Sequence, residues 1–243
     1  STVTSKDDIN LARDILLQEG LDYPYLISKI ERAEALEKFD EILEVSDSIM
    51  VARGDMGVEV KLAQVPVIQK KLISGCNVVG KPVITATQML ESMINSSIPT
   101  RAEVTDVANA IYDGTDAIML SGETSVGRYP IEAVKIMAQV AIETETALPY
   151  ERMLIEKRVQ LEPQPDYAIS YDACQTAQQL NASLILAFTE SGSTAGRVSK
   201  YRPMTPVIAL TTSKQAQRHL TLRWGVTPVI VPNLHSVDDF FAI

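Results

Sequence analysis

The sequence predicts an α/β fold in which parallel strands alternate with helices, and two observations support this prediction. Short apolar segments are separated by longer segments with the amphipathic period of a helix, and such alternation is typical of parallel βα units. The composition is that of an ordinary globular protein, because 46% of the 243 residues are hydrophobic, 22% are charged and 5% are aromatic. A chain of this length can bury one large core or two smaller ones.

The first series of units is expected to begin with a helix near Asp7–Glu19, which Ser5 or Asp7 would cap. Four strands are predicted after it, at Tyr25–Ile30, Ser48–Ala52, Pro82–Ala86 and Ala117–Leu120. The remaining helices of this series are predicted near Arg32–Leu43, Leu62–Val79, Arg101–Tyr112 and from Pro130 to about Ala147. Thr100 and Glu103 form the T-x-x-E pattern of a capping box, and Gly114 can end the helix that they begin.

A charged segment with three prolines divides the chain. Residues 149–165 contain Pro149, Pro163 and Pro165 and show little periodicity, so they are predicted to link a domain at 1–148 to a partial α/β domain with a mainly parallel sheet at 166–243. The strands of the second domain are predicted at Ser183–Thr189, Val207–Thr211 and Pro228–Val231. Its helices are predicted near Ile169–Leu180, Thr194–Tyr201 and Ser213–Thr221.

The charge and the cysteines exclude several classes of function. Lys and Arg number 22 against 31 Asp and Glu, a net charge of −9, so nucleic acid and anionic membranes are poor partners. No apolar run approaches the about 20 residues of a membrane span. Cys76 and Cys174 have no paired spacing and no His nearby, which argues against a disulfide scaffold or a zinc site and indicates a reducing, cytoplasmic location.

Charged side chains stand at the predicted carboxyl ends of two neighbouring strands. Lys29 and Glu31 are two residues apart, as are Arg53 and Asp55, and side chains with this spacing point to the same face of a strand. Barrel enzymes place their catalytic groups at such strand ends. Glu31 and Asp55 supply the oxygen ligands that suit Mg²⁺ or Mn²⁺, and Lys29 could stabilise a transferring phosphoryl group or an enolate oxygen.

Simpler interpretations stay open at this point. The Lys29–Glu31 and Arg53–Asp55 pairs could be structural ion pairs, and Thr87, at the end of the third strand, could be an ordinary hydrogen-bonded residue. The R-G-D tripeptide that ends the second strand could be an adhesion motif, although its strand looks buried. Gly54 would let the backbone approach a ligand, so that its N–H and that of Asp55 could hold a carboxylate. The spacing alone predicts a metal-assisted barrel enzyme.

Three longer stretches resemble the pyruvate kinase family. They read F-D-E-I-L-E-V-S-D-S-I-M-V-A-R-G-D-M-G-V-E-V (Phe39–Val60), K-P-V-I-T-A-T-Q-M-L-E-S-M (Lys81–Met93) and P-T-R-A-E-V-T-D-V-A-N-A-I-Y-D-G-T-D-A-I-M-L-S-G-E-T (Pro99–Thr124). The match is nearly continuous from about Ser5 to Ala147, and T-E-S-G-S-T-A-G-R-V-S-K-Y-R-P (Thr189–Pro203) resembles the opening of the family's C-terminal domain. The fold implied is the second half of a TIM (β/α)8 barrel, followed by part of the C-terminal α/β domain.

The resemblance implies transfer of a phosphoryl group from phosphoenolpyruvate to ADP, giving pyruvate and ATP. Lys29 matches the family's transition-state lysine, and Glu31 and Asp55 match its protein ligands for Mg²⁺. Gly54 and Asp55 match residues whose backbone holds the substrate carboxylate, and Thr87 matches a substrate-binding threonine implicated in protonating the enolate. Two groups of supporting residues are also implied: Ser121 and Glu123 near that proton path, and Arg53 with the helix from Arg101 near subunit contacts.

The family's C-terminal domain often binds a phosphorylated effector. The matching residues here would form a turn before a helix, where backbone N–H groups favour phosphate: Thr189, Ser191, Gly192, Ser193 and Thr194. Two positions depart from the family pattern, because Glu190 stands where some regulated members carry Lys and Ser193 where many carry Arg or Lys. An ordinary helix-start turn is the alternative interpretation.

The resemblance covers only part of the family's length. The ligands of a K⁺ ion, the ADP-contacting groups and the lid domain would lie outside these residues, so the chain alone is expected to form at most a trace of ATP. Its open strand edges are expected to favour dimers or aggregates, and the intact family is usually tetrameric. Two alternatives are a non-catalytic half-barrel that serves in effector binding or oligomerisation, and a class II aldolase-like lyase, which the continuous match disfavours.

Overall fold

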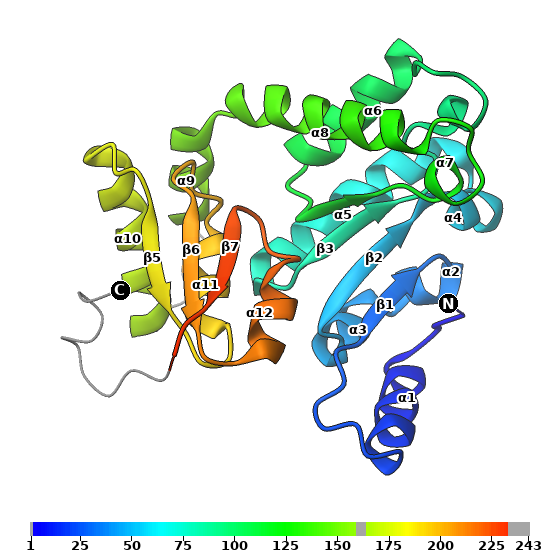
Figure 1. The fold of residues 1–243 in the computed structure, drawn as a ribbon. Helices are drawn as coiled ribbons and strands as arrows, with labels where there is room; N and C mark the ends of the chain where they lie inside the picture. Colours follow the sequence, from blue (N-terminus) through cyan, green and yellow to red (C-terminus); the bar gives the residue numbers. More distant parts are fainter. Residues whose placement is uncertain (1, 159–163, 233–243) are drawn as a thin grey trace. The chain divides into compact units, whose positions relative to one another are not determined.

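The computed structural model describes residues 2–158 and 164–232 (Figure 1). Contacts within the chain define two compact units, Ser1–Leu148 and Pro149–Ile243. Each unit holds one sheet whose strands all run parallel. The predicted α/β fold with parallel sheets is therefore confirmed.

The first unit carries a four-stranded sheet in the order β1-β2-β3-β4, which is also the order along the chain. Its strands are β1 (Ile27–Ile30), β2 (Ser48–Ala52), β3 (Val83–Ala86) and β4 (Ala117–Met119). Register pairs Lys29 with Met50, Val51 with Thr85, and Ala86 with Met119. Because neighbouring strands are parallel and in sequence, their carboxyl ends meet at one edge of the sheet.

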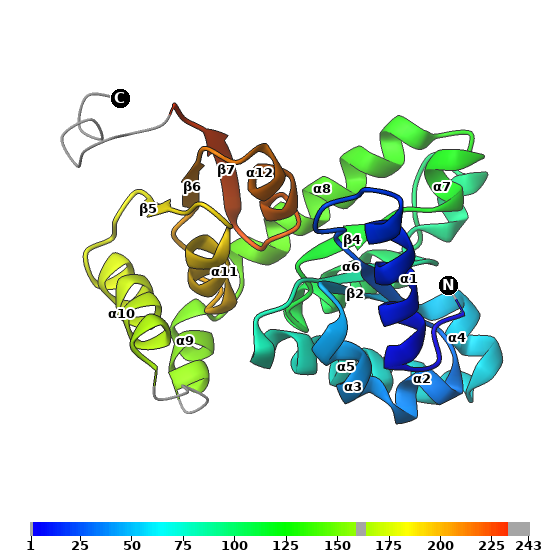
Figure 2. The same ribbon diagram turned by 90° about the horizontal axis from the view of Figure 1, so that it is seen from below.

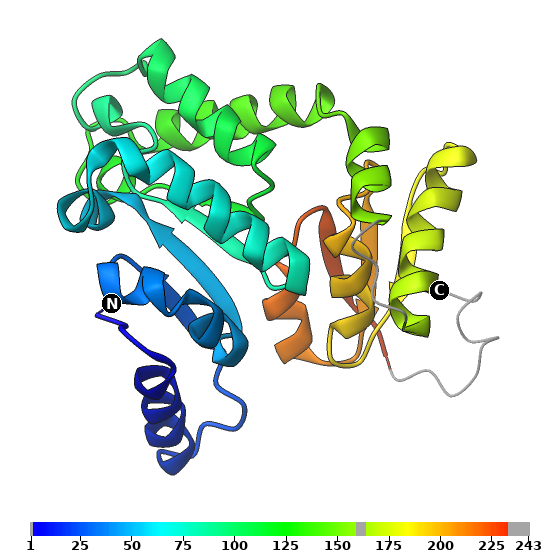
Figure 3. The same cartoon turned by 180° about the vertical axis from the view of Figure 1, so that it is seen from behind.

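Helices follow each of these strands and cover the sheet, as Figure 3 shows for α3, α5 and α6. The helices of the first unit are α1 (Lys6–Gln18), α2 (Ala33–Glu37), α3 (Phe39–Val45), α4 (Arg53–Glu59), η1 (Leu62–Gln64), α5 (Val65–Val79), η2 (Glu91–Ile94), α6 (Arg101–Tyr112), α7 (Gly122–Ser125) and α8 (Pro130–Thr146). Ile49 and Val51 of β2 are fully buried, in one cluster with Leu72 and Ile73 of α5. This apolar contact joins the sheet to its helices.

The local helix signals are confirmed, whereas the short helices were not predicted. Ser5 is the N-cap of α1, and Thr100 and Glu103 form the capping box of α6. The helix predicted at Arg32–Leu43 is instead two helices, because Lys38 leaves helical geometry at φ −105° and ψ 22°. The helices α4, η1, η2 and α7 are too short to show a helical period in the sequence.

The second unit carries a three-stranded sheet in the order β5-β6-β7. Its strands are β5 (Ile185–Phe188), β6 (Val207–Thr211) and β7 (Val226–Ile230), and its helices are α9 (Tyr150–Arg158), α10 (Pro165–Gln179), α11 (Ser193–Lys200) and α12 (Lys214–Leu220). All four helices add buried residues to a core around Ala187 and Ala209, among them Leu154, Cys174, Val198 and Leu220. Figure 2 shows α9, α10 and α11 gathered beside the strands.

The predicted linker at 149–165 is wrong in its first half. Residues 150–158 form the helix α9, and Leu154 within it is only 7% exposed and belongs to the core of the second unit. The buried Leu154 and a hydrogen bond from Lys157 Nζ to the Lys200 carbonyl at 2.7 Å hold this helix against the rest of the second unit, although its sequence shows almost no amphipathic pattern. Residues 159–163 of this prediction lie outside the described residues, as do residues 233–243 of the predicted second domain.

One face of the second sheet carries exposed apolar side chains. Leu186 pairs with Ile208 and Phe188 with Leu210 in the register of β5 and β6, on the face opposite buried Ala187. Leu186 is 54% exposed and Phe188 37%. Parallel sheets are normally covered on both faces. Within residues 2–158 and 164–232, no helix has the length and apolar character needed to cross a membrane.

Candidate active site

The side chains predicted from two neighbouring strands do meet at the carboxyl edge of the first sheet. The Lys29 ammonium lies 2.8 Å from Oδ2 of Asp55 and forms a second ion pair with Oε2 of Glu31. Glu31 is the buried member, with a side chain 8% exposed, whereas the side chains of Lys29 and Asp55 are 28% and 61% exposed. The backbone N–H of Thr2 donates to Oε1 of Glu31 at 3.1 Å. The cluster therefore opens to solvent on the side of Asp55.

The charges of this cluster stabilise one another. The hydrogen bond from Lys29 holds the pKa of Asp55 below its ordinary value. The hydrogen bonds to Asp55 and then to Glu31 raise the pKa of Lys29, against the opposing effect of burial. Lys29 and Asp55 are therefore each stabilised in their charged form, and two carboxylates converge on one ammonium group.

The residues present fit a divalent metal. The Lys29 ammonium lies between the carboxylates of Glu31 and Asp55. Carboxylate oxygens are the ligands that Mg²⁺ and Mn²⁺ prefer. Oε2 of Glu31 is buried and accepts no hydrogen bond beyond its ion pair with Lys29. Among the described residues no group of three or more His, Cys, Asp and Glu side chains gathers around one point. A metal here would need substrate and water oxygens to complete its coordination.

Thr87 lies next to Gly54 at this edge. The Gly54 N–H donates to Thr87 Oγ1 at 2.7 Å, and the Thr87 hydroxyl donates to the carbonyl of Ala86 at 2.6 Å. A Cβ atom on Gly54 would lie 3.4 Å from Thr87 Oγ1, at van der Waals contact, so the two residues are packed directly against each other. The Gly54 N–H, predicted to hold a carboxylate, is thus already used by the Thr87 hydroxyl.

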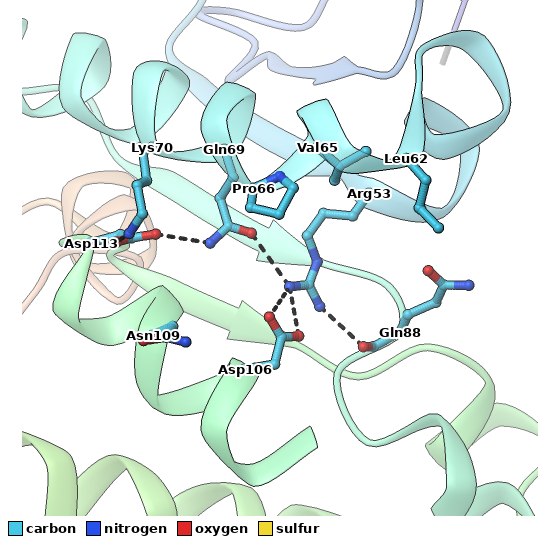
Figure 4. A pocket seen from close by; sticks show the side chains of 10 residues that line it. All are labelled: Arg53, Leu62, Val65, Pro66, Gln69, Lys70, Gln88, Asp106, Asn109 and Asp113. Carbon is cyan, nitrogen blue, oxygen red and sulfur yellow. Dashed lines mark hydrogen bonds and ion pairs between the residues drawn. The ribbon is translucent and has the colours of Figure 1, made fainter. Parts of the chain in front are cut away.

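Arg53 does not form the predicted pair with Asp55. Its side chain, 8% exposed, runs instead between α5 and α6, where Nη1 lies 2.7 Å from Oδ2 of Asp106 (Figure 4). Arg53 Nη1 also donates to Gln69 Oε1 at 3.3 Å. The reason is that the helix α4 begins at Arg53. In a helix, side chains two residues apart do not share a face as they do in a strand, so Arg53 and Asp55 point in different directions.

A pocket of about 460 Å³ lies beside the Arg53 side chain. Apolar residues of η1 and α5 form one wall, and polar residues of α5 and α6 form the other, as the sticks in Figure 4 show: Leu62, Val65, Pro66, Gln69, Lys70, Gln88, Asp106, Asn109 and Asp113 line it with Arg53. Lys70 and Gln69 both contact the Asp113 carboxylate. Neither Gln69 nor Asp106 was predicted from the sequence to be a site residue. A buried arginine requires a carboxylate partner, but no local signal identifies which one.

Glu123 joins the ends of β3 and β4. It is fully buried, and its carboxylate accepts the N–H of Leu90 at 3.0 Å and the N–H of Ser121 at 2.8 Å. Ser121 is half-buried and precedes α7. Glu123 is therefore a buried support that ties the Ser121 backbone to Leu90, three residues after Thr87 in the loop that follows β3.

The turn predicted in the second unit precedes α11. Gly192 has φ +91° and is the N-cap of α11, so Ser193 and Thr194 form the first turn of that helix. The Gly192 N–H donates to Thr189 Oγ1 at 2.9 Å and the Ser193 N–H to Ser191 Oγ at 3.4 Å. These five residues belong to the second unit, whereas every other candidate residue belongs to the first.

Comparison with known proteins gives one family over both units. The family model for the barrel domain of pyruvate kinase matches residues 1–134, and the model for the pyruvate kinase alpha/beta domain matches residues 167–243. A pyruvate kinase of Clostridium acetobutylicum is 49% identical over 242 residues, which are 100% of this chain and 51% of that protein. A pyruvate kinase of Staphylococcus haemolyticus is 50% identical over 239 residues, 98% of this chain and 41% of that protein.

A solved structure of a pyruvate kinase from Cryptosporidium parvum matches with a TM-score of 0.95 and 42% identity, over 100% of this chain and 50% of that chain. The chain thus spans about half the length of the relatives that it matches. The two matching family models describe two domains of the same family and together cover most of this chain. The chain belongs to the pyruvate kinase family.

Proposed function

We propose that this chain supplies the metal- and phosphoryl-binding side of an enzyme that transfers a phosphoryl group from phosphoenolpyruvate to ADP. The observation that supports the proposal is the convergence of Lys29, Glu31 and Asp55 at the carboxyl edge of a parallel sheet. The relatives named pyruvate kinase are 49% and 50% identical to this chain over nearly its full length. A structural ion pair would not need two carboxylates around one lysine at this particular edge.

Each residue has a role in this proposal. Glu31 and Asp55 would hold Mg²⁺ or Mn²⁺, which supplies Lewis-acid stabilisation of the phosphoryl oxygens when bound. Lys29 would then direct its ammonium to the phosphoryl group and to the enolate oxygen of the product. Thr87 would take part in protonating the enolate, for which its hydroxyl must leave the carbonyl of Ala86. The backbone around Gly54 and Asp55 would position the substrate carboxylate.

Supporting roles follow from the contacts of the remaining residues. Glu123 would keep Ser121 and the loop after β3 in place through its two backbone hydrogen bonds. Family membership further supports a cytoplasmic, tetrameric enzyme, and any K⁺ ligands are proposed to lie outside these residues. The ADP-contacting groups are also proposed to lie outside these 243 residues, so the chain alone should form at most a trace of ATP.

The test is metal-dependent binding of phosphoenolpyruvate to the chain, measured by titration calorimetry with and without Mg²⁺. We expect binding that requires the metal and is lost in Lys29→Met, because the phosphoryl group then lacks its cationic partner. Lys71→Met, which removes an exposed lysine of α5, is the matched control and should bind as the parent chain does. Equal affinity in the two variants, or binding without metal, would reject the proposal.

A phosphorylated effector is a second candidate ligand, proposed for the turn at Thr189, Ser191, Gly192, Ser193 and Thr194. The observation that favours it is an arginine beside this helix start: a side chain on Gly196 would lie 3.1 Å from the Arg223 guanidinium carbon, so Arg223 lies across the first turn of α11. Phosphate placed there would meet both the helix N-terminus and a guanidinium. Chemical-shift changes with inorganic phosphate that persist in Arg223→Gln would contradict this proposal.

A further inference from the structure

The turn that carries Thr87 has an unusual backbone. Thr87 and Gln88 have φ +70° and +54°, so two consecutive residues with side chains occupy the left-handed region. Each such residue costs about 1–2 kcal/mol relative to ordinary backbone. Such a conformation persists only where its surroundings hold it in place.

Arg53 makes the contacts that hold this turn. Its Nε and Nη2 donate to the Thr87 carbonyl at 3.2 and 2.8 Å, and Nη2 also donates to the Gln88 carbonyl at 3.1 Å. The same planar guanidinium therefore binds both carbonyls of the strained pair. The residue next to Arg53 binds the other side of Thr87, because the Gly54 N–H donates to its hydroxyl oxygen.

The helices α5 and α6 fix the position of the guanidinium. Arg53 Nη1 donates to Asp106 of α6 at 2.8 Å and to Gln69 of α5 at 3.3 Å. Gln69 in turn donates to Asp113 Oδ2 at 3.0 Å. All three guanidinium nitrogens thus donate hydrogen bonds: Nε and Nη2 to the turn, and Nη1 to the two helices. An arginine can bind both at once because its planar fork carries five donors in fixed directions.

We propose that Arg53 is a positioning residue for Thr87: its guanidinium, anchored on Asp106, holds the Thr87–Gln88 turn in the left-handed conformation that points the Thr87 hydroxyl toward Gly54. This deepens the proposed function, on which it rests for the claim that Thr87 acts on substrate. The conformational claim itself stands on the contacts of the turn. The pocket beside Arg53 gives small cations access to the position of the guanidinium.

The test is NMR of the 243-residue chain with two observables. The intraresidue HN–Hα cross-peak of Thr87 is strong only at positive φ, and the exchange rate of the Gly54 amide reports its hydrogen bond to Thr87. In Arg53→Lys, which keeps the charge but lacks the fork, we expect the strong cross-peak to be lost and Gly54 exchange to rise roughly fivefold or more. Asp106→Asn should change both observables in the same direction as Arg53→Lys, but by a smaller amount.

Two further variants separate positioning from a general loss of structure. Asn109 is an exposed residue of α6 that lines the same pocket and takes no part in the hydrogen bonds of Arg53, so both observables should stay at the parent values in Asn109→Ala. Arg53→Ala should regain the Thr87 cross-peak in millimolar methylguanidinium, which can enter through the pocket, and should not regain it in methylammonium. If Arg53→Ala does not fold, the comparison of Asp106→Asn with Asn109→Ala decides the question.

An unchanged Thr87 cross-peak in folded Arg53→Lys, or equal effects of Asp106→Asn and Asn109→Ala, would overturn the proposal. Neither observable needs substrate. If the chain does not bind phosphoenolpyruvate, the proposed function is rejected, and the result on the Thr87 turn still stands. If the chain binds phosphoenolpyruvate and the Arg53 variants leave the turn unchanged, only the positioning role of Arg53 is rejected.

Discussion

The two sheets of this protein share one architecture and use it differently. In both, parallel strands follow one another in sequence order and end at helices. At the carboxyl edge of the first sheet, side chains cross from strand to strand: Lys29 reaches Asp55, and Gly54 reaches Thr87. In the second sheet, the contacts between the turn after β5 and the next strand use backbone carbonyls: the Thr189 N–H donates to the Leu210 carbonyl and the Thr211 hydroxyl to the Glu190 carbonyl. An edge crossed by charged side chains can hold a metal, whereas a turn held through its backbone offers mainly N–H groups.

The largest expected effect lies at the first edge. Glu123→Ala removes a carboxylate that accepts two backbone N–H groups in a fully buried position. Leaving both donors without partners should lower the free energy of unfolding of the first unit by about 2–5 kcal/mol. Urea unfolding followed by circular dichroism measures it. Glu132→Ala, an exposed glutamate of α8, is the control and should change stability by less than about 0.5 kcal/mol. Similar values for both variants would show that the edge does not depend on this carboxylate.

The second unit should instead be sensitive to alkaline pH. Burial raises the pKa of the Cys174 thiol from 9.0 to about 12. The folded state keeps the proton that the unfolded state releases, so this stability is present below pH 9 and is lost as pH rises from 9 toward 12. Between pH 8 and pH 10 the loss should be about 1.4 kcal/mol.

The single tryptophan of the chain, Trp224, lies buried in the second unit and reports its unfolding by fluorescence. The free energy of unfolding is measured at pH 8 and at pH 10, for the parent chain and for Cys174→Ala, with both proteins kept reduced. Between these pH values the parent chain should lose about 1.4 kcal/mol more stability than Cys174→Ala, because the variant has no thiol to titrate. The same pH slope in both would contradict the raised pKa.

The smallest effects come from the helix caps, which the two units share. Thr100→Ala removes the acceptor for the Glu103 N–H in α6, and Ser213→Ala removes the acceptor for the Ala216 N–H in α12. Each substitution should lower the free energy of unfolding of its unit by about 1 kcal/mol. Circular dichroism measures the effect of Thr100→Ala, and Trp224 fluorescence measures the effect of Ser213→Ala. A loss in both signals from either single variant would mean that the two units unfold together.

Local signals predicted much of this molecule. The strand at Ser48–Ala52 and the cap at Thr100 follow from an apolar run and from a hydroxyl residue placed before a helix. The spacing of Lys29 and Glu31 predicted their shared face, because side chains alternate along a strand whatever the rest of the chain does. These parts of the fold depend on neighbours in sequence.

The parts that could not be predicted depend on packing between distant segments. Arg53 is buried against Asp106, 53 residues away, and this contact exists only once α5 and α6 have packed on the sheet. The helix α4 also escaped prediction, because Gly54 and Gly57 lower its helix propensity. The helix α9 could not be predicted, because its contacts with the second unit are made by Leu154 and Lys157 with residues distant in sequence.

The central claim is that Lys29, Glu31 and Asp55 form a divalent-metal site rather than a structural ion cluster. The most direct measurement is Mn²⁺ binding to the chain, followed by electron paramagnetic resonance, in the parent and in Glu31→Gln, Asp55→Asn and Lys29→Met. We predict one site that is lost or strongly weakened in the two carboxylate variants and tightened in Lys29→Met, where a repelling ammonium is gone. Mn²⁺ binding that is the same in all four proteins would contradict the account.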